Sequence, residues 1–176
     1  MKAAVYYENG PPSVLKYEEV PDPSCAPNGI VIRVEAVSIE GGDTLNRQGG
    51  ALMSKPHIVG YQAAGEVVQI GADVKDFKLG DKAVTTGFNG SHAELRAVAA
   101  RTAWKIPKGC DVKLAAVVPV PFGTAHDCLF EFGHLKSGET VLVQAGASGV
   151  GVAAIQLAKR AGARVRLADR GEGVEP

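Results

Sequence analysis

The stretch that most limits how this chain can fold is VLVQAGASGVG at 141–151, an apolar run that breaks into a glycine-rich turn. Consecutive apolar positions are typical of a strand in a parallel sheet that is covered on both faces. Residues 150–162 then carry small apolar side chains at helical spacing, with Gly162 as a terminating glycine. A second strand is expected over 163–169. The sequence therefore predicts one strand–helix–strand unit, which opens a doubly wound α/β fold.

The turn between this strand and the helix has the composition of a phosphate site. Backbone N–H groups at a helix start can donate to phosphate oxygens where no side chain obstructs them. In the pattern G-x-G-x-x-G the three glycine positions are held here by Gly146, Ser148 and Gly151. The residues expected to bind the pyrophosphate of a dinucleotide are Gly146, Ala147, Ser148, Gly149, Val150 and Gly151. The alternative is a tight strand-to-helix turn that binds nothing.

Two residues after the second expected strand bear on which dinucleotide would bind. Asp169 stands where a carboxylate accepts hydrogen bonds from ribose hydroxyls, which favours NADH. Arg170 beside it could instead accept a 2′-phosphate, which favours NADPH. Both cofactors therefore stay open.

About the first hundred residues predict short strands joined by turns rich in glycine and proline. The clearest strand is 29–39, in which Ile30 and Ile32 fall on one face while Arg33 points the other way. Further strands are expected at 2–7, 15–20, 65–71, 81–86 and 93–99. This spacing is typical of a small barrel or sandwich, in which 41–50 is expected to be a glycine-bounded loop with about one helical turn.

The pattern changes near residue 110, where helical spacing replaces alternation. Residues 110–118 predict a short helix capped by Asp111, and residues 122–133 predict a second helix. We therefore expect a β-rich domain over 1–121, followed by an α/β domain over 122–176.

Composition excludes several classes of protein. Nineteen basic and 19 acidic residues give zero net charge, which argues against a nucleic-acid-binding surface. The three cysteines, Cys25, Cys110 and Cys128, are far apart and form no CxxC, so a reducing compartment is expected. No apolar run is long enough for a signal peptide or a membrane span, which favours a cytoplasmic protein without membrane partners.

Several segments, in order and spacing, resemble the medium-chain dehydrogenase/reductase superfamily, and within it the zinc-independent, zeta-crystallin-like quinone oxidoreductases. They are EAVSIEGGDTLNRQGG (35–50), PHIVGYQAAGEVVQIGADVKDFKLGDKAV (56–84), GSHAELRAV (90–98), LAAVVPVPFGTAHDCLF (114–130) and LKSGETVLVQAGASGVGVAAIQLAKRAGARV (135–165). The resemblance implies a GroES-like catalytic barrel over 1–121. Over 122–176 it implies the first β-α-β unit of a Rossmann NAD(P)-binding domain, which is incomplete.

The resemblance also bears on metal binding. Zinc members of the superfamily carry a Cys before the Asp of the first segment and a Gly-His-Glu in the second. Here residues 39–43 read IEGGD and residues 60–62 read GYQ. Catalytic zinc needs several good ligands and an open position, so no bound metal is expected. His57, His92 and His134 are isolated in the sequence and are expected to be structural or at the surface. A zinc alcohol dehydrogenase is the weaker alternative.

Without zinc, the resemblance implies hydride transfer from NADPH or NADH to a quinone or an activated alkene such as an enone. The protein would position this acceptor and polarise its carbonyl. The candidate catalytic residues are Asp43, Arg47, Tyr61 and Thr124. Asp43 and Arg47 match the family's D-x-x-x-R, and an ion pair that fixes the loop is favoured over direct catalysis. Tyr61 could donate to a carbonyl oxygen or simply pack, and Thr124 matches a residue near the nicotinamide.

Two departures from the family pattern leave the substrate open. Glu40 stands where quinone oxidoreductases often carry Asn, and Leu45 where they often carry Tyr. The tail GEGVEP (171–176) does not resemble the family's continuation, and a dinucleotide lies across strands from both halves of a sheet. We therefore interpret the chain as a truncated form or fragment of an oxidoreductase, with little activity expected from the 176 residues alone. The alternatives are a non-catalytic binding or assembly module and one chain of a two-chain enzyme. Exposed strand edges favour a homo-oligomer.

Overall fold

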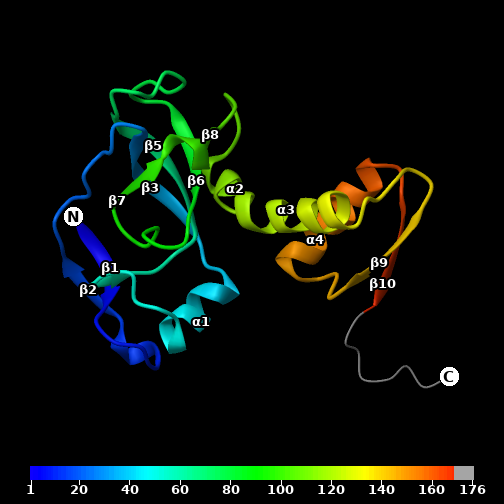
Figure 1. Cartoon of the computed structure of the whole chain (residues 1–176), viewed down its shortest axis with the longest axis horizontal. Coiled ribbons are helices and arrows are strands. Elements are labelled where there is room, and N and C mark those ends of the chain that lie inside the picture. Colours follow the sequence, from blue (N-terminus) through cyan, green and yellow to red (C-terminus); the bar gives the residue numbers. More distant parts are fainter. Residues whose placement is uncertain (169–176) are drawn as a thin grey trace. The chain divides into compact units, whose positions relative to one another are not determined.

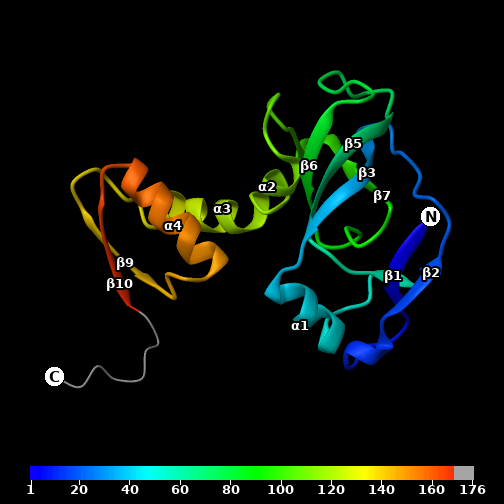
Figure 2. The same cartoon turned by 180° about the vertical axis from the view of Figure 1, so that it is seen from behind.

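The computed structural model describes residues 1–168, and the chain divides into two compact units, Met1–Pro119 and Val120–Pro176. The sequence pattern predicts the boundary between residues 121 and 122. Figures 1 and 2 label the elements of each unit from opposite sides.

The larger sheet of the first unit is antiparallel throughout and orders its strands β7-β3-β5-β6-β8 (Figure 1). Its strands are β3 (Gly29–Ser38), β5 (Gln62–Ile70), β6 (Lys82–Thr86), β7 (Leu95–Ala99) and β8 (Ala103–Lys105). A smaller antiparallel sheet, ordered β2-β1-β4, consists of β1 (Lys2–Tyr6), β2 (Lys16–Glu19) and β4 (His57–Ile58). A bridge between Ala3 and Ala93 connects β1 to the segment just before β7.

The core of the first unit is built around β3. Ile30 and Ile32 are fully buried and Arg33 is exposed, which confirms the expected alternation at these positions. Val31 is fully buried as well, so this end of β3 is covered on both faces. Ile30 and Ile32 pack with Ala63, Val67, Phe77, Ala83 and Ala103. Burial of each such large apolar side chain contributes about 1.5–3 kcal/mol.

The helices of the first unit differ from the expectation in one place. Segment 41–50, expected to be a loop with about one helical turn, forms the nine-residue helix α1 (Gly41–Gly49). The terminal glycines do not prevent the helix, because Oδ2 of Asp43 accepts a hydrogen bond from the Glu40 amide (2.8 Å) and closes its N-terminus. The remaining helices are η1 (Pro12–Val14), η2 (Ala100–Thr102) and α2 (Val112–Ala116). Asp111 caps α2 as expected, because its Oδ1 accepts from the Lys113 amide.

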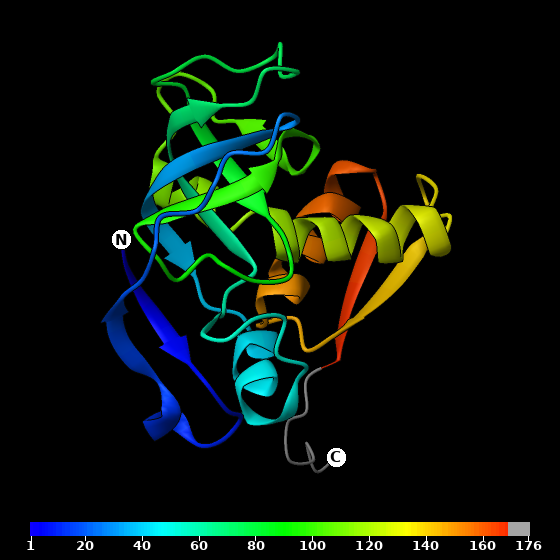
Figure 3. The same ribbon diagram turned by 60° about the vertical axis from the view of Figure 1, so that its left-hand side comes forward.

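The second unit is one strand–helix–strand unit with a helix before it. Its elements are α3 (Pro119–His126), the π-helical continuation η3 (Asp127–Phe132), β9 (Thr140–Gln144), α4 (Gly149–Arg160) and β10 (Arg164–Ala168). β9 and β10 are parallel, and α4 packs against them (Figure 3). Ala125, Leu129, Val143, Ala153, Ala154 and Ala158 form its buried core. An antiparallel β-rich unit followed by one parallel strand–helix–strand unit agrees with the expected fold class.

The end of α4 follows the prediction made for Gly162. This glycine has φ +80°, the Gly162 amide donates to Lys159 O, and the Ala163 amide donates to Ala158 O. These bonds satisfy the last carbonyl groups of the helix and turn the chain into β10. Within residues 1–168, no helix is long and apolar enough to cross a membrane.

Candidate active site

Tyr61 is held over the first turn of α1. A Cβ atom at Gly42 would overlap the Tyr61 ring, so the glycine gives that ring its place. The Tyr61 hydroxyl accepts a hydrogen bond from Asn46 Nδ2 (3.0 Å), and the Tyr61 carbonyl oxygen accepts from the Gly87 amide (2.8 Å). Since the hydroxyl proton has no acceptor within residues 1–168, Tyr61 can donate it to a ligand.

Asp43, in the first turn of α1, is deeply buried, at 4% exposure. Its Oδ2 accepts from the Glu40 amide and lies 3.8 Å from Nε2 of His92, while its Oδ1 is buried without a partner in the described part of the chain. Burial raises the pKa of the Asp43 carboxyl, and the Glu40 amide, His92 and Arg96 oppose that rise. The carboxyl therefore takes up a proton more readily than an exposed aspartate.

Arg47 does not pair with Asp43, so the expected loop-fixing ion pair is wrong. No nitrogen of Arg47 lies within 4.0 Å of an Asp43 carboxylate oxygen. Asp43 turns back to the N-terminus of α1, whereas Arg47 Nε donates to Gly10 O (3.1 Å) and Arg47 O accepts from the Gly10 amide (2.9 Å). Arg47 thus fastens α1 to the segment that follows β1.

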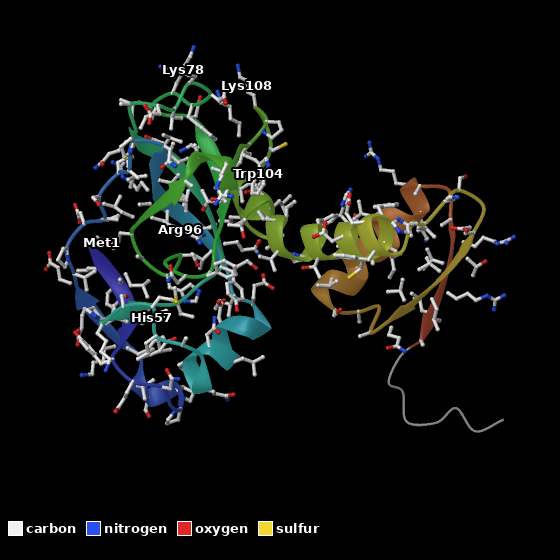
Figure 4. The ribbon with its side chains drawn as sticks, viewed as in Figure 1. Met1, His57, Lys78, Arg96, Trp104 and Lys108 are labelled. Carbon is white, nitrogen blue, oxygen red and sulfur yellow. The ribbon has the colours of Figure 1, made fainter. Side chains whose placement is uncertain are left out.

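Arg96 is a central residue of this site that the sequence analysis missed. Its side chain, labelled in Figure 4, is 2% exposed. Nη2 donates to Tyr61 O (2.9 Å) and Asn89 O (3.0 Å), and Nη1 donates to Thr85 O and Oγ1. Burial lowers the pKa of Arg96 to about 10, with Asp43 opposing, so the guanidinium is still charged at neutral pH. In a strand with alternating polarity, a charged residue is expected to face solvent. The Arg96 side chain points inward instead, and no feature of the sequence shows this.

Glu40 and Gln62 join the start of α1 to β5. Oε1 of Glu40 accepts from Ser38 Oγ (2.8 Å) and from Nε2 of Gln62, which is fully buried. Glu40 and Tyr61 lie in the two segments in which zinc members of the resembled superfamily carry ligands, and both are engaged with protein partners. Within residues 1–168, His, Cys, Asp and Glu side chains nowhere gather in a group of three that could hold a metal ion.

The histidines of the first unit are both enclosed. His57 is 2% exposed, and its Nδ1 accepts from the Met53 amide (3.2 Å). His92 lies beside Asp43, a placement that its isolated position in the sequence did not predict. Burial lowers the pKa of both imidazoles.

The glycine-rich turn of the second unit precedes α4. Ser148 is the N-cap residue, and its Oγ accepts from the Gly151 amide (3.0 Å). A Cβ at Gly151 would overlap Ala145 O, so this glycine permits close packing of helix and strand. The Gly149 and Val150 amides donate to no atom of residues 1–168 and are available to a phosphate.

The other expected site residues are distributed along the chain. Gly146 and Ala147 form the turn between β9 and α4, and Thr124 is exposed on α3. Asp43, Arg47 and Tyr61 belong to the first unit, whereas Thr124 and 146–151 belong to the second. Asp169 and Arg170 lie outside the described residues.

Comparison with known proteins identifies the family. Residues 26–108 match the family described as "Alcohol dehydrogenase GroES-like domain". A quinone oxidoreductase of Pongo abelii is 32% identical over 169 residues, which cover 94% of this chain and 51% of that protein. An acryloyl-coenzyme A reductase of Sulfurisphaera tokodaii is 31% identical, with coverage of 94% and 57%.

Solved structures give the same result. The structure of Escherichia coli quinone oxidoreductase complexed with NADPH matches with a TM-score of 0.87 and 30% identity, covering 95% of this chain and 52% of that one. The chain thus spans about half the length of the relatives it matches. The matched GroES-like segment, the similarity to quinone oxidoreductases over 94% of this chain and the shared fold together show that the chain is a partial member of the medium-chain dehydrogenase/reductase superfamily.

Proposed function

We propose that this chain carries the catalytic unit and the first part of the cofactor unit of an NAD(P)H-dependent oxidoreductase that works without zinc. Its acceptor is a quinone or an activated alkene, as the names of the quinone oxidoreductase and acryloyl-coenzyme A reductase relatives suggest. The observation that carries the proposal is the state of Glu40 and Tyr61, in the two segments where zinc members carry metal ligands. Glu40 is hydrogen-bonded to Ser38 and Gln62, and Tyr61 is set over Gly42 with its hydroxyl proton free.

The glycine-rich turn fits a dinucleotide. NADPH or NADH would supply the hydride, and the E. coli relative was solved with NADPH. The free amides of Gly149 and Val150 would donate to the pyrophosphate at the positive end of α4. Gly146, Ala147 and Ser148 would shape the turn around it, and Asp169 and Arg170 are proposed to select between the two cofactors.

The first unit would bind the acceptor beside α1. Tyr61 donates a hydrogen bond from its hydroxyl group to the acceptor's carbonyl oxygen, which polarises that carbonyl for hydride attack. Arg47 and Arg96 act through the backbone, because they fix α1 and the Tyr61 carbonyl oxygen. Thr124 is proposed to lie near the nicotinamide. Self-association through the edges of β9 and β10 also stays a prediction.

A direct test measures oxidation of NADPH and of NADH by the purified protein, with a benzoquinone and with a small enone as acceptors. Little activity is expected from these 176 residues alone, so we expect slow turnover, which a metal chelator leaves unchanged. Stoichiometric zinc together with alcohol oxidation would overturn the proposal in favour of a zinc alcohol dehydrogenase. Absence of both turnover and dinucleotide binding would instead favour a non-catalytic binding module.

A further inference from the structure

Asp43 and His92 form a buried acid–imidazole pair that the proposed function does not yet use. Asp43 Oδ2 lies 3.8 Å from His92 Nε2, and the two side chains are 3% and 16% exposed. Asp43 Oδ1 and His92 Nε2 are both buried without a hydrogen-bond partner in the described part of the chain. Buried polar atoms are nearly always paired, so two orphaned atoms in facing groups call for an explanation.

The imidazole of His92 is held in place through its own backbone. The His92 amide donates to Val59 O (3.1 Å), and His92 O accepts from the Ala4 amide (2.9 Å). Gly60, at φ +117°, leaves the space that the ring occupies, since a Cβ there would lie 2.7 Å from His92 Cδ2 and would overlap Ser91 Oγ. The same glycine precedes Tyr61, so His92 and the proposed acceptor site share one short segment.

The charged groups around Asp43 and His92 are engaged by other partners, so the two side chains can exchange a proton with each other. Glu40, His92 and Arg96 face Asp43, and Asp43 and Arg96 face His92. Arg96 stays charged and is committed to carbonyl and hydroxyl oxygens, while Glu40 is engaged by Ser38 and Gln62. Burial raises the pKa of Asp43 and lowers that of His92, so the two proton affinities approach each other.

We propose that Asp43 and His92 together are the proton donor of the reduction: Asp43 stabilises the imidazolium, which releases its proton to the reduced acceptor. This inference rests on the proposed function. Hydride transfer forms a C–H bond and leaves the electron pair on the acceptor's oxygen. The ring nitrogen of His92 that does not face Asp43 then gives up its proton as the O–H bond forms. The neutral imidazole regains a proton from water through the exposed part of its side chain.

The first experiment needs no cofactor. The titration of His92 in the whole chain is followed by NMR, with its signal assigned from a His92→Gln variant, in the native protein and in Asp43→Asn. We expect the pKa of His92 to fall by about one unit in Asp43→Asn, because the amide no longer stabilises the imidazolium. The titration of His57 is the internal control, since burial alone shifts its pKa. Asp81→Asn, which alters a surface pair with Lys105, is the matched control variant.

An unchanged pKa of His92 in Asp43→Asn would contradict the proposal that Asp43 stabilises the His92 imidazolium. The side-chain amide oxygen of Asp43→Asn can still accept from the Glu40 amide, so we expect the variant to fold. If it does not, the titration of Asp43 in His92→Gln decides. In His92→Gln the pKa of the Asp43 carboxyl should rise, because the facing imidazolium is lost; no rise would again contradict the pair.

The second experiment tests the donor role through the pH dependence of turnover. In His92→Gln we expect kcat to fall about 10²-fold or more and to lose its dependence on pH near neutrality, while the KM for NADPH is unchanged. An unchanged kcat profile in an active protein would overturn the donor role. No turnover by the native protein would contradict the proposed function instead, and the coupled NMR titration would still decide whether the pair exists.

Discussion

The ring of Tyr61 lies against Gly42, and the absence of a side chain there sets the ring's position over α1. The Tyr61 hydroxyl reaches Asn46 one turn further along the same helix, and its carbonyl oxygen is fixed by Arg96. Tyr61 is therefore anchored at both ends of the residue, by the helix and by the buried guanidinium. A proposed donor held in this way loses little conformational entropy when it binds a substrate.

Replacement of Gly42 by alanine should displace this ring. The new methyl group would occupy the space of the ring, so we expect Gly42→Ala to lower the free energy of unfolding by about 1–3 kcal/mol, as overpacking does. Gly41→Ala is the matched control, because a Cβ at Gly41 meets nothing within 4 Å in the same helical turn. Urea denaturation followed by circular dichroism measures both. Equal midpoints for the two variants would show that the ring moves aside freely.

Arg96 should tolerate no conservative replacement. In Arg96→Lys one ammonium group cannot reach Tyr61 O, Asn89 O and Thr85 together, so buried oxygens lose their partners. We expect a loss of about 2–4 kcal/mol in unfolding free energy. Arg101→Lys, at an exposed position of η2, should change it by less than about 0.5 kcal/mol. Denaturation midpoints of the two variants provide the test, and a stable Arg96→Lys would contradict the bridging role.

Sequence patterns predicted the long elements of this fold and missed its two shortest strands. β3 and α4 were found because ten or more residues repeat a clear period. β4 and β8 have two and three residues, too few to show alternation, and depend on pairing with β1 and β6. The glycines that bound α1 predict a loop, whereas the Asp43 carboxylate accepts from the Glu40 amide and closes the N-terminus of a helix.

In the candidate site too, features made by contiguous residues were predictable from the sequence, whereas contacts between residues far apart in the sequence were not. The turn 146–151 was recognisable because phosphate binding depends on a contiguous stretch of backbone. The Asp43–His92 proximity joins residues on α1 and before β7, which only tertiary packing brings together. The family's D-x-x-x-R predicts an ion pair between Asp43 and Arg47, but Asp43 accepts from the Glu40 amide and Arg47 donates to Gly10 O.

Acid should destabilise the first unit through His57. Burial holds its pKa below the ordinary value of 6.5, so the folded state favours the neutral imidazole that accepts from the Met53 amide. Stability from this residue is complete above about pH 6.5 and is lost as the pH falls below that value, by up to about 1.4 kcal/mol per pH unit.

His57→Gln should reduce the dependence of the unfolding free energy on pH. The pKa of His92 is also lowered, so His92 should account for the dependence that remains. His134→Asn is the control, because His134 is exposed and its φ of +49° suits asparagine. Unfolding free energies between pH 5 and pH 8 give the slopes. The same slope in native protein and His57→Gln would exclude His57 as the origin.

Gly151 and Gly149 should respond in opposite ways to the same change. Gly149→Ala adds a methyl group at ordinary distance from Pro121 (3.7 Å) and should stabilise α4 by about 0.5–1 kcal/mol. Gly151→Ala forces a methyl group into Ala145 O and should cost about 1–3 kcal/mol. Amide hydrogen exchange along α4 reports on the second unit alone. Slower exchange in Gly151→Ala would contradict the close packing of helix and strand.

The Ser148 hydroxyl stabilises α4 but occupies a backbone amide that could otherwise bind phosphate. Its hydroxyl caps the Gly151 amide, so Ser148→Ala should cost α4 about 1 kcal/mol, whereas Ser148→Gly should cost only a few tenths of that. The glycine variant also frees the Gly151 amide for a phosphate oxygen, and one more charge-assisted bond would tighten NADPH binding by up to about tenfold. Titration of NADPH fluorescence against the native protein and both variants measures this. Weaker binding by Ser148→Gly would mean that the hydroxyl itself holds the phosphate, in which case Ser148→Ala would weaken binding at least as much.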